Sequence, residues 1–150
     1  MFKKLVEKLY FAQKGNLALY DQFTGCLNRN WYNLESSKYN NKNCYVTVVD
    51  INGLKKMNDT KGHQAGDLLI SSVANTLLNN FKKDVVCRFG GDEFIVISKN
   101  DPSALLQSIH ATSSFSFGTV LKDSTTTLET AFNQADERMY SQKVATKQAR

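Results

Sequence analysis

The chain has 150 residues, enough for one domain with a substantial core, and its apolar and charged fractions of 41% and 22% are those of an ordinary globular protein. Its three cysteines are odd in number and widely spaced, which argues against a disulfide framework and against a C-x-x-C zinc site. The formal net charge of +5 is spread over short lysine pairs, which suits contacts to a phosphorylated small molecule better than a broad nucleic-acid surface.

No run of the sequence is long and apolar enough to span a bilayer. Charged side chains interrupt residues 1–15, so this segment lacks the continuous apolar core of a signal peptide. We therefore expect a cytoplasmic protein with no membrane segment in this chain.

Residues 1–20 are predicted to form a helix. Apolar side chains recur at alternating three- and four-residue steps from Phe2 to Leu19, with Asn16 at a position that can fix the register of a coiled coil. The pattern is shorter than three heptads, so a helix packed on its own domain remains the alternative to a dimerising stalk. Residues 21–150 are expected to form one domain.

The first half of this domain alternates helix and strand. Asn28 is suited to cap a helix, and the β-branched run Cys44–Ile51 predicts a strand. Asp50 near its end is an acid in a segment otherwise built for burial, which is costly unless the charge is paired or bound to metal. A short helix and then a loop are expected over 52–66, with a longer helix beginning at Asp67.

The second half opens with two strands, 84–89 and 93–98, joined by a glycine pair as in a hairpin. Asp101 is expected to cap a short helix, and a strand is predicted over 114–121. Thr126 and Glu129 then have the spacing of a capping box that opens a last helix. This order of elements predicts a layered α/β domain whose sheet contains antiparallel strands.

Asp50, Asp92 and Glu93 can meet at one end of the sheet if the first strand lies beside the hairpin. Carboxylate oxygens suit Mg²⁺, and two such ions can activate a hydroxyl and steady a transferring phosphoryl group. The alternative is that Asp92 and Glu93 only solvate a tight turn, and spacing alone does not decide. Gly90 and Gly91 lack a Cβ, which lets the turn adopt unusual dihedral angles and lets a ligand approach the backbone.

The motif FGGDEF, Phe89–Phe94, resembles the motif that names the GGDEF family of diguanylate cyclases. Further segments resemble signatures of that family in the same order: DQFTGCLNR (21–29), VDINGLKKMND (49–59), GHQAGD (62–67), SFGTV (116–120) and ADERMYSQK (135–143). The resemblance covers about residues 21–147. It implies an α/β (α+β) fold with a palm-like or ferredoxin-like sheet flanked by helices.

The resemblance also implies the site residues. Asp50 and Asp92 match metal ligands for Mg²⁺ or Mn²⁺, with the backbone carbonyl of Ile51, and Glu93 matches a second acid that acts through metal or proton handling. Further matched positions would hold the triphosphate: Gly53, Leu54, Lys55, Gly90, Gly91, Lys143 and Lys147.

Asn58 and Asp67 match the pair that reads guanine. A carboxylate can accept hydrogen bonds from both N1–H and the 2-amino group of guanine, a pattern that adenine lacks. The alternatives are that Asn58 caps a turn and that Lys143 is a surface lysine.

The implied reaction joins two GTP molecules into cyclic di-GMP and releases two pyrophosphates. Each domain would hold one GTP, so catalysis requires two domains facing each other and predicts a homodimer. The alternatives are a weak or inactive GTP-binding module, and a cyclase that makes another cyclic dinucleotide.

The sequence departs from the family at four places. Phe81 stands where many relatives carry the arginine of an R-x-x-D product-inhibition site, so we do not expect strong inhibition of that type. The segment between Ile97 and Ser116 is shortened. Lys147 replaces an arginine and keeps its charge but not its planar grip on phosphate, and Leu54 replaces a phenylalanine.

Overall fold

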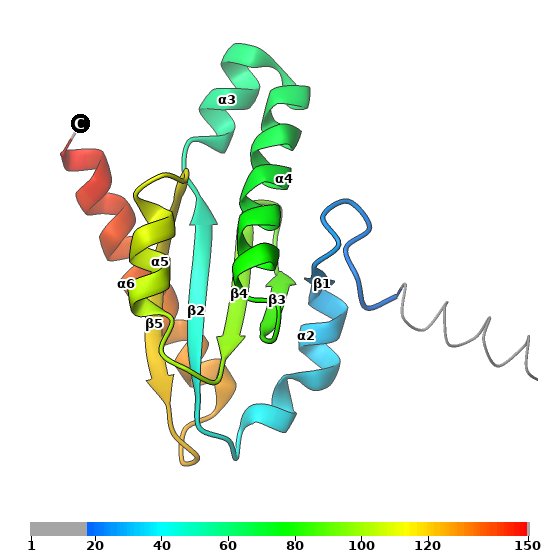
Figure 1. The fold of residues 1–150 in the computed structure, drawn as a ribbon, viewed down its shortest axis with the longest axis vertical. Helices are drawn as coiled ribbons and strands as arrows, with labels where there is room; N and C mark the ends of the chain where they lie inside the picture. The colour runs from blue at the N-terminus through cyan, green and yellow to red at the C-terminus, as the bar shows by residue number, and fades with distance from the viewer. Residues whose placement is uncertain (1–17, 150) are drawn as a thin grey trace, which may run out of the picture.

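The computed structural model describes residues 18–149, in which five strands form one sheet in the order β1-β3-β4-β2-β5 (Figure 1). The strands are β1 (Leu27–Asn28), β2 (Cys44–Ile51), β3 (Val85–Arg88), β4 (Glu93–Ser98) and β5 (Phe115–Lys122). β1 runs parallel to β3, and every other neighbouring pair is antiparallel. The predicted α+β class with an antiparallel-containing sheet is confirmed.

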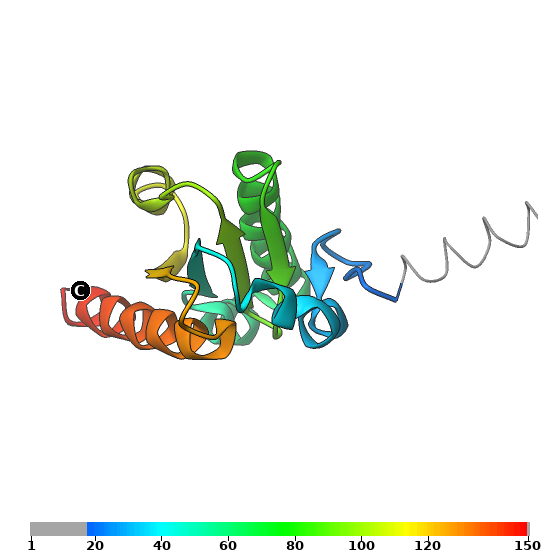
Figure 2. The same ribbon diagram turned by 90° about the horizontal axis from the view of Figure 1, so that it is seen from below.

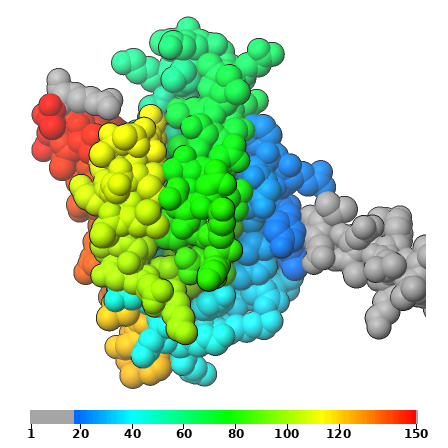
Figure 3. Space-filling view, viewed as in Figure 1, coloured from blue at the N-terminus to red at the C-terminus, as the bar shows by residue number. Residues whose placement is uncertain are grey.

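Helices cover both faces of this sheet. They are α2 (Arg29–Glu35), α3 (Leu54–Lys61), α4 (His63–Asn80), α5 (Ser103–His110) and α6 (Leu128–Gln148), with a 3₁₀ helix at Ser36–Tyr39. α4 and α5 lie side by side over one face (Figure 3), and α6 lies on the other face together with α2 (Figure 2). None of the helices in the described part of the chain could cross a lipid bilayer.

The predicted N-terminal helix over 1–20 falls largely outside the described residues. At its end, Ala18 and Leu19 form a turn, and Tyr20 makes an isolated antiparallel bridge to Leu27. These last three positions are therefore not helical, because the chain here already pairs with the edge of the sheet.

α4 begins at His63, four residues before the predicted start at Asp67, and the expected loop between the two helices is absent. Gly62 alone separates α3 from α4, and its φ of +85° lies in the region that only glycine adopts without strain. The direct junction places Asp67 inside α4 and turns this end of α4 toward α3.

Two helix starts lie one residue away from their predicted positions. α5 begins at Ser103, whose backbone N–H donates to the Asp101 carboxylate at 2.9 Å. α6 is capped by Thr127, whose hydroxyl accepts from the backbone N–H of Thr130 at 3.1 Å. The predicted capping box at Thr126 is wrong, because the N–H and hydroxyl of Thr126 hydrogen-bond the side chain of Asp123 instead.

Alternation along the strands divides the core between the two faces of the sheet. Val49 and Ile51 of β2 pack in the cluster beneath α4 and α5, whereas Val46 and Val48 pack in the cluster beneath α6. The cysteines are buried and free, as predicted, and burial raises the pKa of Cys87 to about 12.

α6 lies so close to β5 that a side chain at Gly118 has no room. α6 also occupies two backbone groups of β5, the strand at the edge of the sheet. The Gln142 side chain accepts from the N–H of Phe117 at 2.7 Å, and Arg138 donates to the carbonyl of Thr119 at 2.6 Å. These contacts fix the position of α6 along the strand.

Lys122 is buried at 1% exposure, and its ammonium group donates to three backbone carbonyls, those of Asn40, Lys42 and Asp123. The three distances lie between 2.8 and 2.9 Å. A buried cation is tolerated only when its donors are satisfied, and here they tie the segment before β2 to the end of β5.

We expect Gly118→Ala to destabilise the fold by about 2 kcal/mol, because overpacking forces backbone to move. A Cβ at this position would lie 2.2 Å from the carbonyl oxygen of Ala135 and 2.3 Å from the nitrogen of Met139. Urea denaturation measures the loss. The matched control is Gly91→Ala, where a Cβ meets no heavy atom within 4 Å. Equal stability of the two variants would contradict the close packing of α6 on β5.

Candidate active site

The end of β2 and the hairpin between β3 and β4 bring the acids together. Asp50 lies opposite Glu93 across the β2–β4 ladder. The carbonyl of Glu93 accepts from Phe89 N–H at 2.8 Å, which closes the hairpin, and Ile51 N–H donates to the carbonyl of Asp92 at 2.9 Å. The hairpin tip is thus tied by its backbone to the end of β2.

The two hairpin glycines behave differently from the prediction. Neither Gly90 nor Gly91 has a positive φ, so the turn needs no unusual dihedral angle, and that part of the prediction is wrong. The tip is nevertheless open, because a Cβ at Gly91 would meet nothing within 4 Å and one at Gly90 would come no closer than 3.6 Å to Glu93.

Arg88, which the sequence did not mark, clamps the hairpin tip. Its guanidinium donates to the Gly91 carbonyl at 2.8 Å and forms an ion pair with Asp21 at 3.1 Å. Burial raises the pKa of Asp21, but the hydrogen bonds from Thr24 and Arg88 outweigh it, and the net pKa is lowered. The D-x-x-T-G turn therefore supports the hairpin.

Lys143 reaches the acids from α6. Its ammonium group lies 2.5 Å from Asp50 Oδ1, and both side chains are about one fifth exposed (21% and 18%). Asp136, also missed from the sequence, is close enough to act on the charge of Glu93. It precedes Lys143 by two helical turns, so helical periodicity could have placed both on one face.

Repulsion and burial disfavour the charged forms of two of these acids. Burial is the largest effect on the pKa of Asp50 and raises it. The hydrogen bond from Lys143 lowers this pKa and the charge of Asp92 raises it, and the net pKa lies above its usual value. Burial also raises the pKa of Glu93, and the charges of Asp136 and Asp50 raise it further. The fold thus holds negative charge here at an energetic cost.

Asp50, Asp92 and Glu93 do not form a ready ligand set. Within residues 18–149, no group of three or more His, Cys, Asp or Glu side chains is arranged to hold a metal ion. The prediction that the three acids meet at one end of the sheet agrees with the pairing of Asp50 with Glu93 and with the effect of their charges on one another, while their role as metal ligands stays a prediction. The oxygen donors themselves remain of the kind that hard divalent cations prefer.

Asn58 and Asp67, the predicted base-reading pair, lie at the junction of α3 and α4. The Asn58 side-chain oxygen is buried and has no hydrogen-bond partner among the described residues. A Cβ at Gly66 would lie 1.7 Å from that oxygen, so any larger residue there would displace the Asn58 amide. Asp67 is exposed on the next position of α4. A buried polar atom without a partner is rare, which marks this corner as a place for a ligand.

The start of α3 follows directly from the end of β2. Gly53 is its N-cap in the left-handed region, with φ +73°, and no side chain in the described part of the chain caps it. The first N–H groups of a helix have no intrahelical acceptor and attract anions. Leu54 is half-buried at this end, while Lys55 and, on the last turn of α6, Lys147 are exposed.

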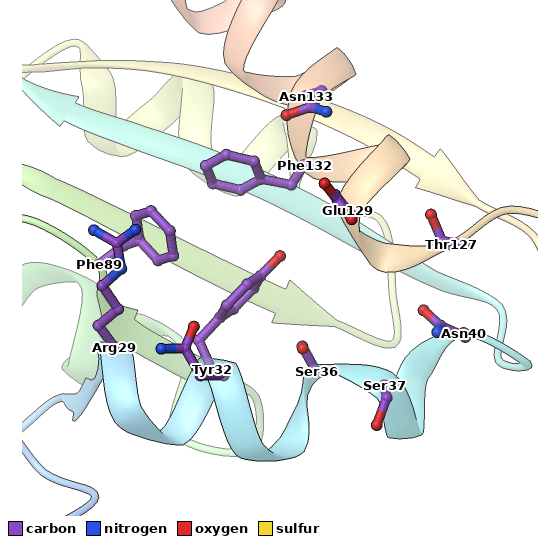
Figure 4. A pocket seen from close by; sticks show the side chains of 11 residues that line it. Arg29, Tyr32, Ser36, Ser37, Asn40, Phe89, Thr127, Glu129, Phe132 and Asn133 are labelled. Carbon is purple, nitrogen blue, oxygen red and sulfur yellow. The ribbon is translucent and has the colours of Figure 1, made fainter.

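A separate cavity of 410 Å³ lies between α2 and the first half of α6 (Figure 4). Phe89 contacts both Tyr32 and Phe132, with ring centroids 5.1 Å apart in each case. Arg29 covers the Phe89 ring at 4.5 Å. These contacts hold Phe89, the residue directly before the hairpin glycines, in place.

Phe81 ends α4 and is buried at 4% exposure in the core beneath α4 and α5. At the position where many relatives are expected to carry the arginine of an R-x-x-D site, this chain therefore has a core residue.

Comparison with known proteins identifies the family. The family described as "Diguanylate cyclase, GGDEF domain" matches residues 18–110, which is more than half of the chain. The chain belongs to the GGDEF domain family. This confirms the resemblance inferred from the motifs.

Two curated relatives carry names that indicate different activities. The chain is 36% identical over 94 residues to the cyclic di-GMP phosphodiesterase NbdA of Pseudomonas aeruginosa, covering 58% of this chain and 12% of that protein. It is 24% identical over 166 residues to the diguanylate cyclase DgcS of Shewanella oneidensis, covering 97% and 56%. The chain thus spans at most about half of either relative.

The fold is similar to that of the coiled coil and GGDEF domain of DgcB from Caulobacter crescentus, solved in complex with c-di-GMP. The TM-score is 0.82 at 22% sequence identity, and the match covers 95% of this chain and 91% of that one.

We expect Glu93→Gln to raise the melting temperature of the metal-free protein near pH 7. Folding raises the pKa of Glu93. The contribution of this side chain to stability is therefore complete below its pKa in the unfolded chain, where it is protonated, and is lost as the pH rises through its pKa in the folded chain. The ionised side chain therefore destabilises the fold at neutral pH, and glutamine removes that charge. Calorimetry in EDTA measures the difference, which should shrink toward about pH 4.

The exposed acid Glu137 on α6 provides the control, since Glu137→Gln should leave the melting temperature unchanged. A fall in melting temperature for Glu93→Gln at neutral pH would show that the ionised form is favoured by folding.

Proposed function

We propose that this domain is a diguanylate cyclase that joins two GTP molecules into cyclic di-GMP and releases two pyrophosphates. One observation carries the proposal: a single end of the sheet places the Asp50–Glu93 pair and Lys143 beside the uncapped start of α3. Acids for a metal, a cation and free N–H groups for phosphate are the parts that phosphoryl transfer requires. The family match and the cyclase relative support it.

We assign Asp50 and Asp92, the Ile51 carbonyl and Glu93 to Mg²⁺ or Mn²⁺. The raised pKa values of Asp50 and Glu93 support this, because a cation relieves the repulsion that raises them. When bound, such an ion activates a hydroxyl and neutralises charge on the transferring phosphoryl group. Lys143, which contacts Asp50 here, would then be available to phosphate.

The guanine base is assigned to the α3–α4 corner. The buried Asn58 oxygen lacks a partner and can accept from the base, while the exposed Asp67 carboxylate can accept from N1–H and the 2-amino group together. Adenine offers no such pair of donors, so the same residues favour GTP over ATP.

The triphosphate is assigned to the start of α3 and the end of α6. The backbone of Gly53 and Leu54 with Lys55 would hold it from one side, and Lys143 with Lys147 from the other. The space at Gly90 and Gly91 leaves room for it beside the hairpin.

One domain provides one such set of residues, so the 3′-hydroxyl of each GTP must attack the α-phosphate of a nucleotide held by a second copy. We therefore propose a homodimer, with residues 1–20 as a dimerising stalk and 21–150 as the cyclase domain. The burial of Phe81 supports the absence of inhibition through an arginine at that position.

The proposal predicts that the purified 150-residue chain converts GTP to cyclic di-GMP with Mg²⁺, read by mass spectrometry. Asp92→Ala should reduce the rate by at least about a hundredfold, as expected for loss of a group that stabilises charge in the transition state. Glu137→Ala, which removes an exposed acid on α6, should leave the rate unchanged. Binding without turnover would instead identify a non-catalytic module. The shortened segment between Ile97 and Ser116 and the lysine at 147 in place of arginine are the reasons to consider this alternative.

Guanine recognition has its own test. Asp67→Asn should weaken GTP binding by roughly tenfold to a hundredfold, because hydrogen bonds to a charged group are lost, and should leave ATP binding as weak as before. Isothermal titration measures both. Asp59→Asn, an exposed acid on α3, is the control. Equal weakening for both nucleotides would refute the assignment.

A further inference from the structure

A cavity of 260 Å³ lies beyond the start of α3, between three parts of the chain. Its walls are Asn52 and Gly53 from the β2–α3 turn, His110 with Ala111, Ser113 and Ser114 after it, and Thr146 of α6. Gly53 borders it, so this cavity adjoins the place assigned above to the triphosphate. None of the functions discussed so far involves His110.

The histidine ring is held in a defined orientation. Its Nδ1 lies 2.7 Å from the carbonyl oxygen of Phe115, and the ring packs against Phe117 with a centroid distance of 5.6 Å. A carbonyl can only accept, so Nδ1 must carry the hydrogen and donate. Nε2 is then the ring nitrogen of His110 that remains available to a ligand.

The character of the walls favours an anion. In the described part of the chain, the lining residues include no acid, and they include the hydroxyl-bearing residues Ser113, Ser114 and Thr146. The Thr146 hydroxyl already donates to the carbonyl of Gln142 at 2.9 Å, which leaves the two serines as donors. Thr146 lies on α6 between Lys143 and Lys147, the two predicted phosphate-binding lysines, although neither lysine lines the cavity itself.

The shortened connection before β5 brings His110 here. α5 ends at His110 and only four residues precede β5. The carbonyl of Ser114 accepts from the N–H of Asn52 at 2.8 Å, and the Ser116 hydroxyl donates to the Asn52 side chain at 2.9 Å. The end of α5 is therefore fixed against the turn that begins α3.

We infer that His110 binds the terminal phosphates of the nucleotide, with Nε2–H donating to a phosphate oxygen while Nδ1–H remains on the Phe115 carbonyl. In this arrangement both ring nitrogens act as hydrogen-bond donors. This inference rests on the proposed function and adds to it a ligand for the part of GTP that leaves as pyrophosphate.

The test is isothermal titration of the 150-residue chain, in Mg²⁺, with α,β-methylene GTP and with GMP. His110→Asn is the most informative variant. The asparagine amide can still donate to the Phe115 carbonyl but has no group at the position of Nε2. We expect it to weaken binding of the triphosphate analogue by about tenfold and to leave GMP binding unchanged. Gln107→Asn, an exposed change on the same helix, should alter neither.

Equal weakening for both ligands would show that His110 only supports the fold, and an unchanged affinity for the analogue would show that it does not touch phosphate; either result overturns the inference. His110→Gln, which keeps a donor near Nε2 but loses the contact to Phe115, should bind the analogue more tightly than His110→Asn does. If the unaltered chain binds neither ligand, the proposed function fails as well. If the unaltered chain binds the analogue and both His110 variants bind it with the same affinity, this inference alone is refuted.

Discussion

The register of β2 between β4 and β5 is the constraint on which the site depends. Side chains alternate along a strand, so a slip of one residue would move Asp50 to the opposite face and expose Val49 in its place. The register is fixed by burial of Val49 and Ile51 on one face, Val46 and Val48 on the other, and by the bond from Ile51 to Asp92. The apolar pattern of β2 thereby positions the end of the sheet that carries the acids.

α6 contributes the second half of the arrangement. The close approach of α6 at Gly118 and its hydrogen bonds to the β5 backbone fix the position of this helix along the strand. This position brings Lys143 to Asp50 and Asp136 near Glu93. The acids at this end are held together against their own repulsion, and the buried cores on both faces supply the free energy for it. Unfavourable local charge of this kind is a frequent property of functional sites.

Local patterns in the sequence were sufficient to predict four of the five strands, the hairpin and most of the described helices, because burial and periodicity are local properties. They missed β1, whose two residues are too few to show a pattern, and the start of α4 at His63, which depends on the backbone of Gly62. The family motifs predict which acids act in the site. They could not indicate that Lys143 contacts Asp50, because that contact depends on how α6 packs.

The hydrogen bonds that Gln142 and Arg138 make to β5 also limit how two copies can meet. An edge strand with free N–H and carbonyl groups invites another strand to join the sheet, but here two of those groups on β5 are already occupied by α6. At the opposite edge, β1 is only two residues long. Neither edge of the sheet is therefore well suited to pairing with a further strand.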